Sequence, residues 1–71
     1  MEIKKAVGER LKESRRAAGY TQAQAAKIMN MTQQQYSRFE NGIFELNYAQ
    51  IIMLCKLYDI SADYLFDLTI F

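Results

Sequence analysis

The stretch from Thr21 to Gly42 reads TQAQAAKIMNMTQQQYSRFENG and is the most informative part of this chain. It predicts two short helices, over about residues 22–29 and 33–41, because apolar residues recur at helical spacing on either side of a break. Asn30 lies at this break and tolerates the left-handed conformation that a sharp turn needs. The stretch therefore predicts two helices joined by a tight turn.

Both helices begin with the same start signal. Thr21 is followed by Gln24, and Thr32 is followed by Gln35. In this capping-box pattern a hydroxyl and a side-chain amide three residues further on satisfy free N–H groups at the helix start. The two patterns fix where each helix begins.

The second of these helices has one face made only of polar side chains. Tyr36 and Phe39 point the other way at about 100° per residue. The polar face carries Gln33, Gln34, Ser37, Arg38 and Asn41. Glutamine and arginine on an exposed helix can hydrogen-bond base edges and phosphates in a DNA major groove. Glutamine is also a fair helix former, so the run could alternatively be plain helix surface.

A further helix is predicted over about residues 3–18. Its apolar positions lie near helical spacing, with charged residues between them: Ile3, Val7, Leu11 and Ala18. Gly19 then offers the left-handed conformation that often ends a helix.

The last part of the chain predicts a helix over about residues 48–58, capped by Asn47. One of its faces is apolar: Tyr48, Ile51, Leu54, Cys55 and Tyr58. A second apolar stripe lies on nearly the opposite side: Ala49, Met53 and Leu57. A helix that is apolar on two sides is expected to be buried on both. A short fifth helix, capped by Ser61, is expected to end near Phe66.

Length and composition favour an all-α fold of five helices in one domain. The chain has 71 residues, is 51% hydrophobic and contains no proline, which suits helices throughout. We expect residues 1–66 to form this domain and residues 67–71 to be an apolar tail. The single cysteine, Cys55, excludes an internal disulfide and is interpreted as a small buried hydrophobe.

No segment predicts targeting or membrane insertion. No secretory signal pattern follows Met1. Nothing approaches the run of about 18 apolar residues that a membrane span requires. A cytoplasmic protein is therefore expected.

The charge is distributed unevenly along the chain. Residues 1–38 hold eight basic and three acidic residues, a charge of +5, and residues 39–71 hold one basic and five acidic residues, a charge of −4. A basic half that faces phosphates and an acidic half that faces away suit nucleic-acid binding. Ordinary scatter of surface charge is the alternative.

Enzymatic function has little support. The chain has no histidine, so the commonest imidazole base and metal ligand is absent. No glycine-rich phosphate loop is present. We expect no catalytic residue, no metal, no cofactor and no small-molecule effector.

About residues 7–66 resemble the lambda-repressor-like family of helix-turn-helix domains, which includes phage Cro and repressor proteins. The resemblance rests on Gly8-Glu9-Arg10-Leu11, Arg15, Gly19, Thr21-Gln22, Ala26, Thr32, Ser37-Arg38, Glu40-Asn41-Gly42 and the run Ser61 to Leu65. It implies five helices with the helix-turn-helix unit at residues 21–42 and residues 33–41 as the recognition helix. Ala25 stands where the family usually has leucine, so the larger Tyr36 and Phe39 are expected to refill the core.

The resemblance also implies roles for individual residues. The positions that match base-contacting residues are Gln33, Gln34, Ser37 and Arg38. The positions that match backbone-contacting residues are Gln22, Thr32, Gln35 and Asn41. Arg38 also matches a position that reaches phosphates, and Gln22 one that braces the recognition helix. Arg15 and Glu40 match a structural ion pair.

The implied partner is double-stranded DNA with a pseudo-palindromic operator, bound by a homodimer that acts as a transcriptional regulator, most simply a repressor. The expected dimer interface comprises Met53, Leu57, Phe66, Leu68, Ile70 and Phe71. The tail could alternatively fold back on its own chain. A second functional hypothesis is a protein-interaction or antitoxin-like module that retains the fold without binding DNA.

Overall fold

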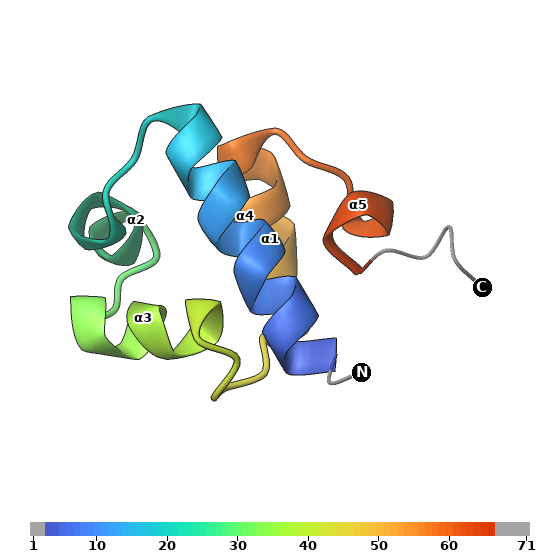
Figure 1. Cartoon of the computed structure of the whole chain (residues 1–71). Helices are drawn as coiled ribbons and strands as arrows, with labels where there is room; N and C mark the ends of the chain where they lie inside the picture. Colours follow the sequence, from blue (N-terminus) through green and yellow to red (C-terminus); the bar gives the residue numbers. More distant parts are fainter. Residues whose placement is uncertain (1–2, 67–71) are drawn as a thin grey trace.

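The computed structural model describes residues 3–66, which form five α-helices and no strand (Figure 1). The helices are α1 (Ile3–Ala18), α2 (Gln22–Ile28), α3 (Gln33–Glu40), α4 (Tyr48–Tyr58) and α5 (Ala62–Phe66). The all-α class and the five predicted helices are confirmed. Only the ends of α2 and α3 differ, by one residue each, because Met29 and Asn41 are caps rather than helical residues.

The predicted helix starts are present as hydrogen bonds. Thr21 Oγ1 accepts from the Gln24 backbone at 3.1 Å, and Gln24 Oε1 accepts from the Thr21 backbone at 2.9 Å. The same reciprocal pair joins Thr32 and Gln35 at 3.1 and 3.0 Å. Asn47 caps α4 as expected, and its partner Gln50 completes a third capping box. Each box satisfies two N–H groups that a helix start leaves free.

Two sharp turns place a residue other than glycine in the left-handed region. Asn30, between α2 and α3, has φ 58°, and Asp59, between α4 and α5, has φ 55°. Asparagine and aspartate reach this region more readily than other side chains because they can hydrogen-bond locally. The predicted stop at Gly19 is confirmed by its φ of 85°.

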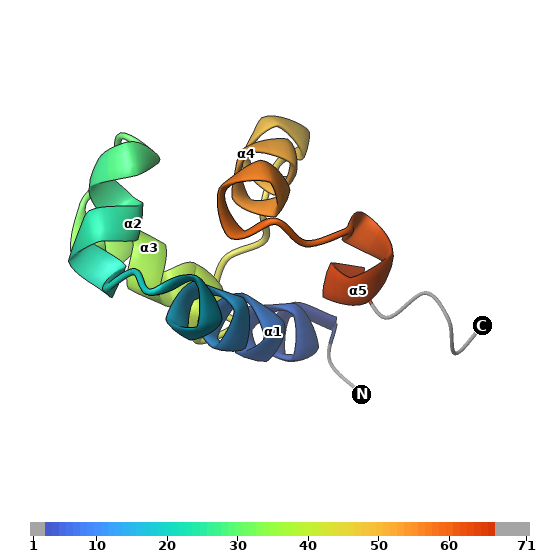
Figure 2. The same cartoon turned by 90° about the horizontal axis from the view of Figure 1, so that it is seen from above.

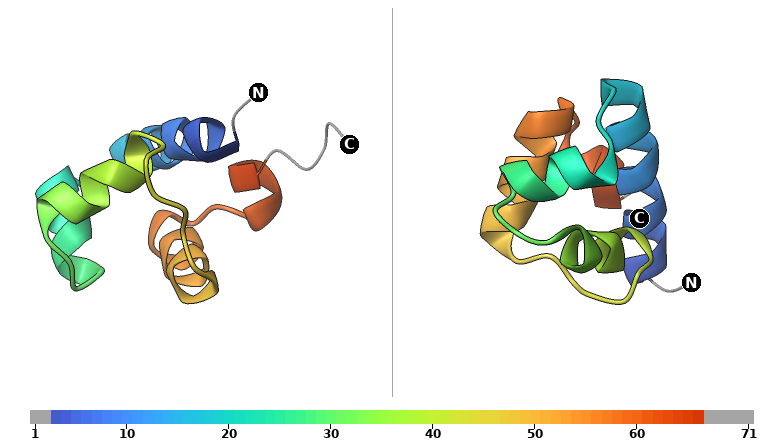
Figure 3. Two further views of the ribbon diagram at one scale, coloured as in Figure 1. Left: turned by 90° about the horizontal axis from the view of Figure 1, so that it is seen from below. Right: turned by 90° about the vertical axis from the view of Figure 1, so that its left-hand side faces the viewer.

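Helix α1 runs through the middle of the molecule. Helices α2 and α3 lie on one side of it and α5 lies on the other (Figure 1). Seen from above, α4 lies beside α1 on the far side of the Figure 1 view (Figure 2). Views from two other sides show that α2 and α3 together form an outer face, away from α5 (Figure 3). This arrangement leaves the predicted recognition helix at the edge of the fold.

The core lies where α1, α3, α4 and α5 converge. Its fully buried large side chains are Tyr36, Leu11, Leu54 and Leu65. Ala25 and Ala26 are buried on the slim inner face of α2, and the expectation that Tyr36 and Phe39 refill this region is confirmed by their burial.

Three expected core residues are exposed. Ile3 is 65% and Tyr48 is 88% exposed, and Ala18 also faces solvent. Each lies in the first or last turn of its helix, beyond the part that packs on a neighbour. The second apolar stripe of α4 is exposed at Ala49 and Met53 and half-buried at Leu57, so the prediction that α4 is buried on both sides does not hold within this chain.

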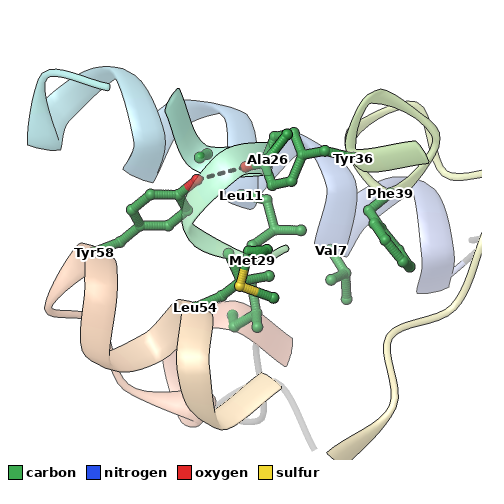
Figure 4. Close-up of a cluster of buried hydrophobic side chains, with 10 residues drawn as sticks. Val7, Leu11, Ala26, Met29, Tyr36, Phe39, Leu54 and Tyr58 are labelled. Carbon is green, nitrogen blue, oxygen red and sulfur yellow. Dashed lines mark hydrogen bonds between the residues drawn. The ribbon is translucent and has the colours of Figure 1, made fainter. Parts of the chain in front are cut away.

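A buried hydrogen bond connects α3 with α4. The hydroxyls of Tyr36 and Tyr58 lie 2.6 Å apart inside the hydrophobic cluster (Figure 4). Burial, and secondly this hydrogen bond, raise the pKa of Tyr36 well above that of free tyrosine. Both hydroxyls therefore stay neutral at ordinary pH, and each satisfies the other in a place that water cannot reach.

Candidate nucleic-acid interface

The exposed face of α3 presents the predicted base-contacting side chains together. Gln33 and Gln34 are exposed in its first turn, and Ser37 and Arg38 are half-exposed in its second. The packed side of the helix buries Tyr36. The polar face is therefore directed outward by the burial of the opposite face.

Two of the residues predicted to contact the DNA backbone already use part of their hydrogen-bonding capacity within the protein. Thr32 and Gln35 use their side-chain oxygens in the capping box of α3. The Gln35 side-chain N–H groups have no hydrogen-bond partner within residues 3–66 and can still donate to a phosphate. The capping box thus orients Gln35 at the start of the helix, where the helix dipole also favours an anion.

Asn41 and Ser37 are linked on the same face. Asn41 Nδ2 donates to Ser37 Oγ at 3.3 Å, in an exposed position. The Ser37 hydroxyl hydrogen remains available to an acceptor, because the bond uses only its oxygen lone pair. The pair forms a polar edge at the end of α3.

A buried ion pair holds α3 against α1. Arg15 Nε donates to Glu40 Oε2 at 2.7 Å, and Arg15 Nη2 donates to Glu40 Oε1 at 3.2 Å. The side chains of Arg15 and Glu40 are only 9% and 1% exposed. Arg15 Nη1 also donates to the Tyr20 carbonyl at 2.9 Å, beyond the end of α1. This two-pronged geometry fixes both the distance and the rotation of α3.

Gln22 joins the same network from α2. Its Nε2 donates to Glu40 Oε1 at 3.0 Å. Glu40 therefore connects the three helices α1, α2 and α3. The second hydrogen on Gln22 Nε2 is not used by this bond and could reach a phosphate, so Gln22 as a backbone contact stays a prediction.

The network keeps Glu40 ionised. Burial opposes its ionisation, but hydrogen bonds from Arg15 and Gln22 outweigh burial and lower the pKa of Glu40. The hydrogen bond to Glu40 is the main cause of a raised pKa at Arg15. Both members of the pair are charged throughout the physiological range.

One contact of α3 joins it to the loop that follows and was not predicted from the sequence. The Arg38 guanidinium lies over the ring of Phe44, 5.3 Å from its centroid. Phe44 belongs to the loop after α3, and its ring meets Phe39 edge-on at 6.0 Å. Helical spacing cannot reveal this contact, because Phe44 lies outside the helix.

The match to known proteins agrees with this geometry. Residues 11–65 match a family model described as "Helix-turn-helix". The chain belongs to the lambda-repressor-like helix-turn-helix family. The architecture of this family is the five-helix arrangement described above.

Curated relatives are named as transcriptional regulators. The chain is 39% identical over 59 residues to the HTH-type transcriptional regulator ImmR of Bacillus subtilis (strain 168), covering 83% of this chain and 46% of ImmR. It is 34% identical over 58 residues to the SPbeta prophage-derived uncharacterized HTH-type transcriptional regulator YonR of the same organism, covering 82% of this chain and 54% of YonR. The chain thus spans about half the length of these relatives.

In this helix-turn-helix protein the outer side of α4 is apolar and exposed. Tyr48, Ile52 and Met53 are 88%, 55% and 44% exposed. Leu57 and Phe66, both expected at a dimer interface, are half-buried against the core of the same chain, and their place in an interface stays a prediction. The other expected interface residues, Leu68, Ile70 and Phe71, lie outside the described residues.

Between residues 3 and 66, no group of three or more histidine, cysteine, aspartate or glutamate side chains is placed to hold a metal ion. No helix in that range is long and apolar enough to span a bilayer. Cys55 is half-buried, and burial raises the pKa of its thiol, which makes it a poor nucleophile.

Proposed function

We propose that this chain is the sequence-specific DNA-binding part of a transcriptional regulator and that α3 reads the major groove. The observation that carries this proposal is the outward polar face of α3, held in place by the Arg15–Glu40–Gln22 network. An α-helix fits the major groove, where each base pair presents a distinct pattern of donors and acceptors. A rigidly mounted helix with glutamines in its first turn suits that task.

Within this proposal the side chains divide into two roles. Gln33, Gln34, Ser37 and Arg38 contact base edges, and Gln22, Thr32, Gln35 and Asn41 contact the phosphate backbone. Glutamine pairs with adenine through N6 and N7, and arginine pairs with guanine through O6 and N7. The backbone contacts fix the register of α3 but carry no sequence information directly.

We expect replacement of Gln34 by alanine to weaken binding to a selected cognate site by about 1–3 kcal/mol and to relax one base position. The reason is the loss of a hydrogen-bond pair to one base edge, while phosphate contacts remain. Binding is measured by fluorescence anisotropy on the cognate duplex, obtained by selection from random sequences, and on a scrambled duplex of equal length.

The control is Gln50→Ala, which removes a glutamine from the first turn of α4, away from α3. It should leave the ratio of cognate to scrambled affinity unchanged. Equal losses on both duplexes for Gln34→Ala would contradict its assignment to a base. No salt-dependent retention of the wild type on random DNA would favour the protein-interaction module instead.

We further propose that the chain binds a pseudo-palindromic operator as a homodimer and acts as a repressor. One recognition helix reads only a few base pairs, and two half-sites about 34 Å apart are the usual solution. Residues 1–66 form the DNA-binding domain in this proposal, and the apolar tail of residues 67–71 extends the interface. Within the described residues this interface comprises the exposed Ile52 and Met53, because an apolar patch on a small protein normally marks a contact surface.

Replacing Met53 by glutamate is expected to shift the protein from dimer to monomer, because a carboxylate would be buried without a partner. Sedimentation velocity at micromolar concentrations, without DNA, measures this. Ile28→Glu is the matched control, since Ile28 is similarly exposed at 46% but lies on α2. A wild type that is monomeric under these conditions would exclude a stable free dimer through α4.

A further inference from the structure

We infer that Phe44 is a positioning residue for DNA binding, which holds the guanidinium of Arg38 ready at the end of α3. The inference rests on the proposed function and extends it to a residue outside the helix-turn-helix unit. Its starting point is the stacking of Arg38 over the Phe44 ring, with 5.3 Å between the guanidinium carbon and the ring centroid. This distance lies within the range of about 6 Å for a cation–π contact.

The Phe44 ring is itself held in place by its contact with Phe39. It meets Phe39 edge-on at 6.0 Å, and Phe39 is only 7% exposed in the core. Phe44 and Leu46 also line a small apolar hollow with residues of α1 and α5. A chain of contacts therefore runs from the core through the two phenylalanine rings to Arg38.

The backbone of the loop is tied to the same residue. The backbone N–H groups of Ile43 and Phe44 both donate to the Arg38 carbonyl, at 2.9 and 3.2 Å. The loop is thereby folded back on the last turn of α3. This return places Phe44 beside the Arg38 side chain although six positions separate them in sequence.

Stacking leaves the hydrogen-bonding groups of Arg38 available. A ring covers the face of a guanidinium, whereas its N–H groups lie in its plane. Within residues 3–66 the Arg38 side chain has no hydrogen bond or ion pair that would compete for those groups. An arginine restrained in this way loses less conformational freedom when it binds a phosphate or a guanine than a free one does.

The test is a double-mutant cycle on DNA binding with Phe44→Leu, Arg38→Gln and the double variant. Phe44→Leu keeps an apolar side chain of similar reach towards the hollow but removes the ring face. We expect it to weaken binding about two- to fivefold, the equivalent of one exposed cation–π contact. In the Arg38→Gln background the same change should have no effect, and Phe44→Tyr should retain wild-type affinity.

Ile43→Ala is the control for the loop as a whole, because Ile43 is exposed and makes the same kind of backbone bond. It should bind like the wild type. Binding is measured on a mixed-sequence duplex about three helical turns long at several salt concentrations, with thermal unfolding of every variant alongside. Any general destabilisation by Phe44→Leu appears equally in both Arg38 backgrounds and cancels in the cycle.

Two results would overturn the inference while leaving the proposed function intact. One is wild-type DNA binding by Phe44→Leu. The other is an equal loss from Phe44→Leu with and without Arg38, which would make the ring a purely structural residue. A wild type that fails to bind DNA at low salt would instead refute the proposed function.

Discussion

Replacing Glu40 by alanine is expected to destabilise the fold by about 3–5 kcal/mol. The change leaves the Arg15 guanidinium buried with no carboxylate, and it also removes the acceptor of the Gln22 amide, which donates to Oε1 of the same carboxylate. A domain of this length rarely has more than about 3–5 kcal/mol of stability in total. The variant should therefore lose most of its cooperative unfolding transition at room temperature.

Urea unfolding followed by circular dichroism measures this loss. The matched control is the double variant Arg15→Met with Glu40→Leu, which removes both charges and fills similar volume. Replacing a whole buried ion pair by apolar residues is often neutral or stabilising, so the double variant should be far more stable than Glu40→Ala. If Glu40→Ala resembled a surface substitution, the pair would not be buried in solution.

The same residue predicts how stability depends on pH. Its folded pKa is lowered, so its contribution is fully present above the unfolded pKa of about 4.3 and is lost as the pH falls through the folded pKa. The difference in unfolding free energy between the wild type and Glu40→Gln should be largest near neutral pH and shrink below about pH 4. A difference that stays constant down to acid pH would show that Glu40 has an ordinary pKa.

Sequence patterns predicted the helices well because their signals are local. Thr21 and Thr32 each precede a glutamine at the spacing of a capping box, and both boxes form. Asn47 and Ser61 likewise mark the starts of α4 and α5. Such pairs depend only on neighbours within one turn, so tertiary packing does not alter them.

Contacts between segments were harder to predict. The pattern of α4 correctly placed Leu54 and Tyr58 on the core side, but it also placed Tyr48 there, which is 88% exposed in the first turn. The helical period shows which side of a helix meets the core, but not how far along the helix its neighbours extend. The stacking of Arg38 on Phe44 depends in the same way on where a loop returns.

Gly8 is the clearest example of a contact between segments that local sequence patterns do not predict. It lies inside α1, where glycine is normally less stable than alanine by about 1 kcal/mol. In the structure a Cβ built on Gly8 would lie 2.4 Å from the Glu40 carbonyl oxygen and 2.7 Å from that of Phe39. Gly8 therefore permits the close approach of α1 to the end of α3, the same crossing that the Arg15–Glu40 pair secures.

Replacing Gly8 by alanine is accordingly expected to destabilise the protein by about 3 kcal/mol, since the clash is with backbone that cannot rotate away. This expected loss of stability is opposite to the effect of helix propensity, because alanine is the better helix former and would by itself stabilise the variant. Thermal unfolding should show a fall in melting temperature of roughly 12–24 °C for a domain of this size.

Replacing a glycine can destabilise a protein through a clash of the added Cβ or through strain at a positive φ, and Gly19→Ala distinguishes these two causes. Gly19 has a positive φ but nothing within 4 Å of a built Cβ, so its replacement should cost only the left-handed strain of about 1–2 kcal/mol. Gly8→Ala should cost more than Gly19→Ala although its backbone is helical. A Gly8→Ala protein more stable than the wild type would mean that α1 and α3 cross further apart than described, and the way in which α3, the proposed recognition helix, is held would then need another explanation.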